Sequence, residues 1–223
     1  MDFNAKTILV IGASGALGSA IAEKLTAAGA TVLGTASSNE TATRIPDSVS
    51  MKLLLNLEQS QSIETLCNYL ISAQKLDGIF VASGCVGFGR LQETSNANAN
   101  RLMAINHDAP TQILSKLVAA LNPDSFIAAI TGVVAEKSFP GMAAYSASKA
   151  ALSTWLQVAN LELKKLGISV IEYRPGHTET GLAGRAIFGI APAMPTGMST
   201  DHVTNVMLEH LIRKTPIVSS LDF

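Results

Sequence analysis

The amino-acid sequence predicts an α/β fold in which a doubly wound parallel sheet of about seven strands carries helices on both faces. Short β-branched or aliphatic runs alternate with segments whose apolar residues recur at helical spacing. Such alternation requires crossover connections, and crossovers give parallel strands. The chain has 223 residues and shows no internal repeat or linker-like stretch, so we expect a single domain over residues 1–223.

Six segments are the strand candidates. Near the C-terminus we expect either a short seventh strand or a sheet edge that a partner covers. Residues 8–11 and 51–55 are nearly uninterrupted apolar runs, which are typical of parallel strands buried on both faces. Between the strands, positions such as Ile63, Leu66 and Leu70 have helical spacing. The candidate strands are residues 7–11, 31–35, 51–55, 78–82, 126–131 and 168–173.

Composition and charge exclude several classes of protein. Apolar residues make up 48% of the chain and the net charge is −1, so we expect no nucleic-acid partner and no membrane association. Cys67 and Cys85 have no second pair and no histidine cluster nearby in sequence, which predicts no disulfide framework and no metal site. A cytoplasmic location is therefore expected. The apolar N-terminal run could also be a short secretion signal, but its regularly spaced glycines favour a structural loop.

A glycine-rich loop follows the first predicted strand. The sequence GASGALG occupies residues 12–18, and residues 19–28 have the pattern of a helix. Gly12, Gly15 and Gly18 would permit the turn and let the backbone approach a pyrophosphate, whose charge the helix N-terminus favours. A tight turn with glycines needed only for packing is the alternative. The position after the first strand favours dinucleotide binding.

The end of the second strand bears on the choice between NAD and NADP. An NAD enzyme normally has an acidic residue there, on the ribose hydroxyls, and this chain has none. Thr35, Ser37 and Ser38 supply hydroxyls instead, and no carboxylate would repel a 2′-phosphate. NADP is therefore the expected cofactor. NAD stays possible, because the arginine that usually pairs with that phosphate is missing unless Arg44 folds back.

Tyr145 and Lys149 form the second candidate site. They lie four residues apart at the start of a helical run, so the phenol and the ammonium share one helix face. A cation at that distance stabilises a phenolate and lowers a tyrosine pKa, which predicts a tyrosine that gives and takes protons. An accidental pair of an amphipathic tyrosine and a solvated lysine is the alternative.

Three segments together resemble the short-chain dehydrogenase/reductase family over almost the whole chain. IGASGALG at residues 11–18 resembles the family's TGxxxGxG loop, and AYSASKAA at 144–151 resembles its YxxxK segment. RPGHTET at 174–180 resembles the PGxxxT stretch that follows the sixth strand. The three occur in the family's order. The resemblance implies a Rossmann-type fold and a nicotinamide dinucleotide cofactor.

By position, the resemblance also implies roles for individual residues. Tyr145 would be the general acid in carbonyl reduction, and Lys149 would bind the nicotinamide ribose and depress the Tyr145 pKa. Asn106 would position a water in the proton relay, while Thr178 and Thr180 would orient the nicotinamide. The expected cofactor contacts are Gly12, Ser14, Gly15, Leu17, Gly18, Thr35, Ser37, Asn56, Leu57, Ser83, Gly84, Tyr145, Lys149, Pro175, Gly176, Thr178 and Thr180.

The sequence departs from the family at several places. The family's carbonyl-polarising serine lies thirteen residues before the tyrosine, and this chain has Gly132 there. Thr131 is the first candidate replacement, although neighbouring residues of an extended strand point to opposite faces. Ser83 is the second, because VASG at 81–84 replaces the family's NNAG. Asn56 stands where an aspartate usually contacts adenine, and Ala16 stands where the loop commonly has glycine.

We therefore predict an oxidoreductase that prefers NADP(H) and interconverts a carbonyl and an alcohol on a small or medium, partly apolar substrate. A flexible flap at residues 182–200, rich in glycine and proline, would cover that substrate. A homodimer or homotetramer is expected through helices at residues 97–121 and 147–166. One alternative is a catalytically degenerate relative that binds dinucleotide as a sensor or scaffold. Another is an epimerase or dehydratase, which needs a larger substrate domain.

Overall fold

A computed structural model describes residues 1–73 and 75–223, and these residues form a seven-stranded sheet in the order β3-β2-β1-β4-β5-β6-β7. Every neighbouring pair is parallel, as the alternating pattern predicts. The strands are β1 (Thr7–Ile11), β2 (Thr31–Ala36), β3 (Met51–Leu54), β4 (Leu76–Val81), β5 (Leu121–Ile130), β6 (Ser169–Tyr173) and β7 (Ile217–Val218). The predicted fold class is confirmed, including the short last strand.

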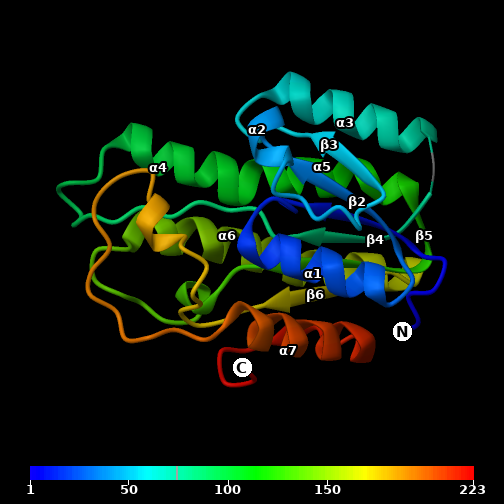
Figure 1. Cartoon of the computed structure of the whole chain (residues 1–223). Coiled ribbons are helices and arrows are strands. Elements are labelled where there is room, and N and C mark those ends of the chain that lie inside the picture. Colours follow the sequence, from blue (N-terminus) through cyan, green and yellow to red (C-terminus); the bar gives the residue numbers. More distant parts are fainter. Residues whose placement is uncertain (74) are drawn as a thin grey trace.

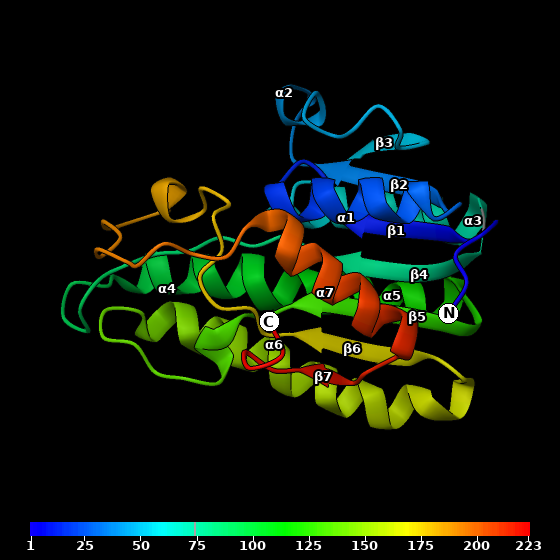
Figure 2. The same cartoon turned by 60° about the horizontal axis from the view of Figure 1, so that its bottom comes forward.

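Helices cover both faces of the sheet. Apolar residues of α3, α5 and α6 pack into one core cluster, and those of α1 and α7 pack into another on the opposite face, which Figure 2 shows in front of the strands. A π-helical turn at Ala104–Asp108 joins α4 to α5. The helices are α1 (Ala16–Ala27), α2 (Asn39–Ala42), α3 (Ser60–Ala73), α4 (Asn96–Met103), α5 (Ala109–Leu117), α6 (Ala143–Leu163) and α7 (Thr200–Arg213).

The prediction that residues 51–55 are buried on both faces is wrong for most of that segment. Met51 is 38% exposed and Leu54 is 51% exposed, whereas Leu55, just after the strand, is buried. The reason is that β3 is the edge strand of the sheet and pairs only with β2. An apolar run does not reveal whether its strand lies in the middle or at the edge.

Some element boundaries also differ from the prediction. Helix α1 begins at Ala16, three residues before the predicted start, because the extended backbone ends at Gly15, which is the N-cap. Strand β5 begins at Leu121, five residues early, where it pairs with Leu76 ahead of an irregularity in the register. Among the described residues, no helix has the length and apolar character needed to span a membrane.

The strand order brings the loops of the candidate site together at the edge of the sheet that is formed by the carboxyl ends of the strands. The order reverses between β1 and β4, and such a switch point at the carboxyl ends of parallel strands is where α/β proteins bind ligands. Figure 1 shows the segment between β6 and α7, coloured gold to orange, beyond the carboxyl ends of β4 and β6. The loops after β1, β4, β5 and β6 all open on this edge.

Candidate active site

The glycine loop after β1 is built for a close backbone approach. Gly12 has φ +85°, and a Cβ there would lie 2.8 Å from the Ser83 nitrogen. A Cβ on Gly18 would lie 2.1 Å from the Gly12 carbonyl oxygen, so the first turn of α1 packs directly on the loop. No side chain caps α1 at Gly15. The helix end is therefore left without a side-chain cap, which is the arrangement that the predicted pyrophosphate contact requires.

The hydroxyl groups at the end of β2 and just after it have different structural roles. Thr35 is buried, and its hydroxyl accepts a hydrogen bond from the Gly12 amide at 3.0 Å, so this side chain supports the loop from behind. Ser38 caps α2 together with Thr41. The Arg44 guanidinium lies 3.8 Å from the Glu40 carboxylate in α2. It is therefore paired with that carboxylate and does not fold back toward the end of β2.

The loop after β4 joins the glycine loop to the second candidate site. The Ser83 hydroxyl is buried and has no hydrogen-bond partner among the described residues. A Cβ on Gly84 would lie 3.1 Å from Lys149 Nζ and 3.2 Å from Asn106 Oδ1. A side chain at position 84 would therefore crowd both Lys149 and Asn106, and glycine leaves room for them. Buried hydroxyl groups in proteins are normally hydrogen-bonded, so Ser83 is an exception that needs an explanation.

Tyr145 and Lys149 lie in the first two turns of α6 and are both buried. Lys149 Nζ donates a hydrogen bond to the Ile130 carbonyl at 3.0 Å, at the end of β5. Burial lowers the pKa of Lys149 to about 8 and raises the pKa of Tyr145 above its ordinary value. The net shift of the tyrosine pKa is therefore opposite to the predicted lowering, because desolvation of the phenol dominates.

Asn106 connects the end of β4 to helix α6. It lies in the π-helical turn and is completely buried. Its amide accepts a hydrogen bond from the Cys85 amide and donates to the Cys85 carbonyl, both at 2.9 Å. It also donates to Ser148 Oγ at 3.0 Å, and that hydroxyl donates to the Tyr145 carbonyl at 2.7 Å. The side chain of Asn106 therefore holds Tyr145 in place relative to β4.

Thr131 does not turn its hydroxyl toward a substrate. Its Oγ1 donates to Glu172 Oε1 at 2.6 Å and contacts the Tyr173 carbonyl at 3.3 Å. The next residue, Gly132, has φ +89°, a conformation in which a serine would be strained even though the space around it is open. The backbone at position 132 therefore favours glycine over the family's serine. Thr131 is not available to replace that serine, because its hydroxyl is bonded to Glu172.

The partner of Thr131 belongs to a buried ionic network that the sequence analysis missed. Glu172 is 1% exposed and accepts hydrogen bonds from Arg174 Nε and Nη2, both at 2.9 Å. Arg174 Nη2 also donates to Ser153 Oγ, one turn after Lys149 on α6. The available signal was a charged residue inside the otherwise apolar strand at 169–173. Breaking such a pair strands a buried charge, which is typically more costly than the pair is stabilising.

The loop after β6 is folded by its own hydrogen bonds. The Pro175 carbonyl accepts from the Val133 amide at 2.8 Å, which ties this loop to the end of β5. Thr178 Oγ1 donates to the Gly176 carbonyl at 3.1 Å, and Thr180 Oγ1 accepts from the Leu182 amide at 3.3 Å. Both threonines therefore lie in the turn that begins the flap.

Asn56 and Leu57, the predicted adenine contacts, lie between β3 and α3. Asn56 follows β3, and its Oδ1 accepts a hydrogen bond from the Glu58 amide at 3.0 Å. Leu57 packs partly buried against the core that α3 covers. Their position at the carboxyl end of β3 is the one the sequence predicts.

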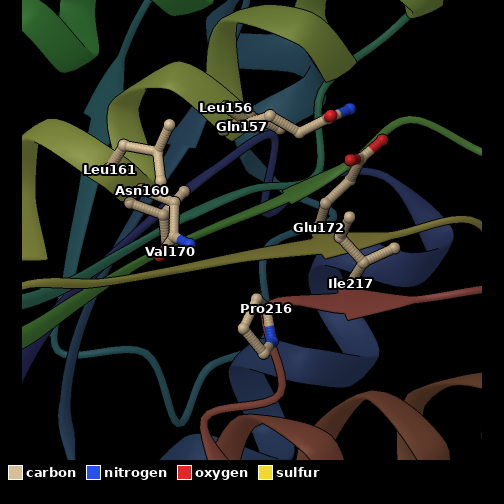
Figure 3. A pocket seen from close by; sticks show the side chains of 8 residues that line it. All are labelled: Leu156, Gln157, Asn160, Leu161, Val170, Glu172, Pro216 and Ile217. Atoms are coloured by element: carbon tan, nitrogen blue, oxygen red, sulfur yellow. The ribbon is translucent and has the colours of Figure 1, made fainter.

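A cavity of about 250 Å³ lies away from these residues, between α6, β6 and β7. Figure 3 shows its lining, with the polar ends of Gln157 and Glu172 near each other and Asn160 beside Val170, and the other lining residues are apolar. Leu156 is eleven residues along α6 from Tyr145, a separation of about 16 Å at the helical rise. This cavity is therefore not part of the candidate active site.

The fold and the site together define a dinucleotide-binding class of α/β protein, with a glycine loop at the β1 end and a tyrosine–lysine pair on the helix after β5. The family model for short chain dehydrogenases matches residues 6–187. The chain belongs to the short chain dehydrogenase family.

Two curated relatives are similar at the sequence level. The 3-oxoacyl-(acyl-carrier-protein) reductase FabG of Salmonella typhimurium is 30% identical over 208 residues, covering 88% of this chain and 85% of that protein. YbbO of Escherichia coli, named an uncharacterized oxidoreductase, is 28% identical over 179 residues, which cover 78% of this chain and 66% of YbbO. The match thus spans just under two thirds of YbbO.

Solved structures show the same fold. A short-chain dehydrogenase from Sphingobium yanoikuyae in complex with NADPH superposes with a TM-score of 0.85 at 25% identity, covering 96% of this chain and 87% of that one. A short chain dehydrogenase/reductase from Burkholderia phymatum in complex with NAD has a TM-score of 0.87 at 17% identity, covering 99% and 90%. Both nicotinamide dinucleotides therefore occur among the structural neighbours.

Proposed function

We propose that this protein is an NADP(H)-preferring oxidoreductase that interconverts a carbonyl and an alcohol on a small or medium substrate. The observation that carries the proposal is the convergence of Tyr145 and Lys149 with Asn106 and the glycine loop at one edge of the sheet. Asn106 joins β4 to α6 through three hydrogen bonds, and Gly84 leaves room for Lys149. Membership in the family and the oxidoreductase relatives support the same activity.

The residues around the loop fit a nicotinamide dinucleotide. Amides at the start of α1 would hold the pyrophosphate, Asn56 and Leu57 would contact the adenine, and Ser37 would contact the ribose next to it. Ser83 Oγ, Gly84 and Lys149 Nζ would hold the nicotinamide ribose, and residues 175–180 the nicotinamide. When bound, the cofactor supplies or accepts a hydride. The buried, partnerless hydroxyl of Ser83 supports this fit.

Tyr145 gives the proton to the carbonyl oxygen in this proposal. A phenol whose pKa is raised by burial stays protonated at neutral pH, which is the state a proton donor needs. Lys149, held at 3.0 Å from the Ile130 carbonyl, brings a positive charge to the same edge and favours the phenolate left after transfer. Thr131 is bound to Glu172, and the hydroxyl of Ser83, a residue that lies beside Gly12, is assigned to the ribose, so Tyr145 is the side chain that we assign to the substrate oxygen.

The alternatives receive less support. A degenerate sensor or scaffold has no need of Tyr145, Lys149 and Asn106 in one connected arrangement. An epimerase or dehydratase needs a larger substrate domain, and the described residues form one sheet with its covering helices. NADP is proposed over NAD because the first carboxylate after β2, Glu40, lies in α2 and faces Arg44.

The test is a turnover assay with both cofactors. We expect NADPH to be oxidised in the presence of aldehydes or ketones, and its Kd from fluorescence titration to be lower than that of NADH. Ser37→Asp, which adds a carboxylate beside the ribose, is expected to reverse that order. The control is Ser50→Asp, an exposed serine before β3. Tighter binding of NADH by the native protein would contradict the proposed preference.

A homodimer or homotetramer is also proposed, through α4, α5 and α6. The outer face of α6 carries Val158 and Leu161, which are 48% and 72% exposed. Covering such side chains stabilises an assembly by burying apolar surface. Sedimentation velocity is expected to show a dimer or larger species that Leu161→Glu weakens. A monomer at every concentration of the native protein would contradict this.

A further inference from the structure

The flap is fastened to the loop after β4 by its backbone. The Phe88 amide donates to the Phe188 carbonyl at 3.0 Å, and the Ile187 amide donates to the Val86 carbonyl at 2.8 Å. These two bonds join the segment 86–88 to residues 187–188, which are far apart in sequence. The flap is therefore attached to the same loop that carries Ser83 and Gly84.

Two glycines make this closure possible. A Cβ on Gly87 would lie 2.2 Å from the Phe188 ring, although Gly87 is not among the residues with positive φ. The missing side chain at Gly87 is therefore explained by the ring that lies on it. A Cβ on Gly189, which has φ +70°, would lie 1.7 Å from the Phe88 carbonyl oxygen. The Phe188 ring therefore packs against the Gly87 backbone, and we call this position its seat.

The closed flap surrounds Tyr145 with apolar side chains. Tyr145 is only 9% exposed, and it shares a cluster with Cys85, Val86 and Phe88 from the loop after β4. The flap contributes Leu182, Ala183, Ala186, Ile187, Phe188 and Ala191. None of these residues carries a charge or an amide. A substrate that reaches the phenol must replace part of this apolar packing.

Three cations lie near this apolar cluster, and each already makes hydrogen bonds. Lys149 Nζ donates to the Ile130 carbonyl, and Arg101 forms a two-bond ion pair with Glu58 at 2.8 and 3.0 Å. Arg185, in the flap, is exposed and donates to the Thr180 carbonyl. A carboxylate on the substrate would therefore have to replace apolar packing and draw one of these cations away from its present hydrogen bonds, and burying a charge in this way is costly.

We infer that the substrate is a neutral, apolar carbonyl compound, and that Phe188, seated on Gly87, is the residue that limits its size. This rests on the proposed function of the same site, because it assumes that Tyr145 meets a carbonyl. The ring of Phe188 fills the space beside the loop after β4, and a substrate group larger than that space requires the ring to leave its seat.

The experiment compares aldehydes of matched shape. With NADPH, kcat/KM for 4-methylbenzaldehyde is expected to exceed that for 4-carboxybenzaldehyde by on the order of 10²-fold. Phe188→Ala is expected to raise kcat/KM for 4-phenylbenzaldehyde relative to 4-methylbenzaldehyde by about tenfold, as removal of a pocket side chain does for larger substrates. The control is Ile190→Ala, in the same flap, where the side chain is 92% exposed; it should leave both ratios unchanged.

A second pair of variants tests the seat itself without relying on turnover. Gly87→Ala should push out the Phe188 ring and increase hydrogen exchange at the Phe88 and Ile187 amides. Adding Phe188→Ala to Gly87→Ala should restore protection at the Ile187 amide, because the clashing ring is gone.

The outcomes separate this inference from the proposed function. Equal kcat/KM for the charged and neutral aldehydes would overturn the substrate class while leaving the carbonyl reductase activity intact. No reduction of any of the aldehydes would overturn the proposed function and the substrate class with it. Unchanged hydrogen exchange in Gly87→Ala would overturn the role of Phe188.

Discussion

Tyr145→Phe is expected to lower kcat for carbonyl reduction by about 10² to 10⁴-fold while leaving NADPH affinity nearly unchanged. The phenol is the proposed proton donor, and its hydroxyl makes no hydrogen bond to another described side chain or backbone group that the fold would lose. The ring itself stays packed among the apolar residues of its cluster. The measurement is steady-state NADPH oxidation together with a fluorescence titration of cofactor binding.

Tyr69→Phe is the matched control for this variant. Tyr69 lies on α3 and is 41% exposed, and within residues 1–73 and 75–223 its hydroxyl donates a single hydrogen bond, to the Met51 sulfur. Its loss of the same oxygen atom should leave turnover unchanged. If Tyr145→Phe kept the native rate, the phenol would not be the proton donor and the assigned mechanism would fail.

The second large effect is expected from Lys149→Met, which should abolish most activity but make the protein more stable at neutral pH. Burial lowers the Lys149 pKa from 10.5 to about 8. Keeping the charge in the folded state at pH 7 then costs roughly 3 kcal/mol. An apolar side chain of similar length avoids this cost, although it also loses the hydrogen bond to the Ile130 carbonyl.

The sign of the pH dependence follows from the lowered pKa. Between pH 8 and 10.5 the unfolded chain binds more protons at this lysine than the folded chain does, so native stability rises with pH through this interval. The advantage of Lys149→Met over the native protein should therefore shrink by roughly 2 kcal/mol between pH 7 and pH 10. Urea unfolding at both pH values measures the difference.

Lys164→Met is the control for that comparison, because Lys164 follows α6 directly and its side chain is exposed. It should change the free energy of unfolding little, and equally at both pH values. An advantage of Lys149→Met that did not depend on pH would show that the lysine is not held at a depressed pKa.

The fold could be predicted because its signals are local. Apolar runs, helical spacing and the glycine loop each follow from a few neighbouring residues, and the parallel direction of the strands follows from the crossover connections. The edge position of β3 could not be predicted, since Met51 and Leu54 look like core residues until the sheet is assembled. The location of a strand within a sheet is a property of the whole chain.

The candidate site was predicted only where a motif marks it. The glycine loop, Tyr145, Lys149 and Asn106 carry fixed spacings, and the structure brings them to one edge of the sheet. The orientation of Thr131 depends instead on Glu172, which lies 41 residues later in the sequence. The tyrosine pKa depends on burial by the flap, and no spacing within α6 reveals that burial.

The contacts of the flap were equally invisible in the sequence. Gly87 is one of 17 glycines in the sequence. The structure explains why glycine is needed there, because the ring of Phe188 lies where a side chain would be. Sequence separation of about a hundred residues hides such a pair from any local pattern.

The central claim is that this chain reduces a carbonyl compound with a nicotinamide cofactor, and isotope transfer tests it most directly. The native protein is incubated with 4-methylbenzaldehyde and NADPH carrying deuterium at both C4 positions, and the alcohol is analysed by mass spectrometry. We predict one deuterium at the carbinol carbon of the product, formed by the native protein and by Ile190→Ala but only in trace amounts by Tyr145→Phe. An absence of alcohol, or alcohol without the label, would contradict the account.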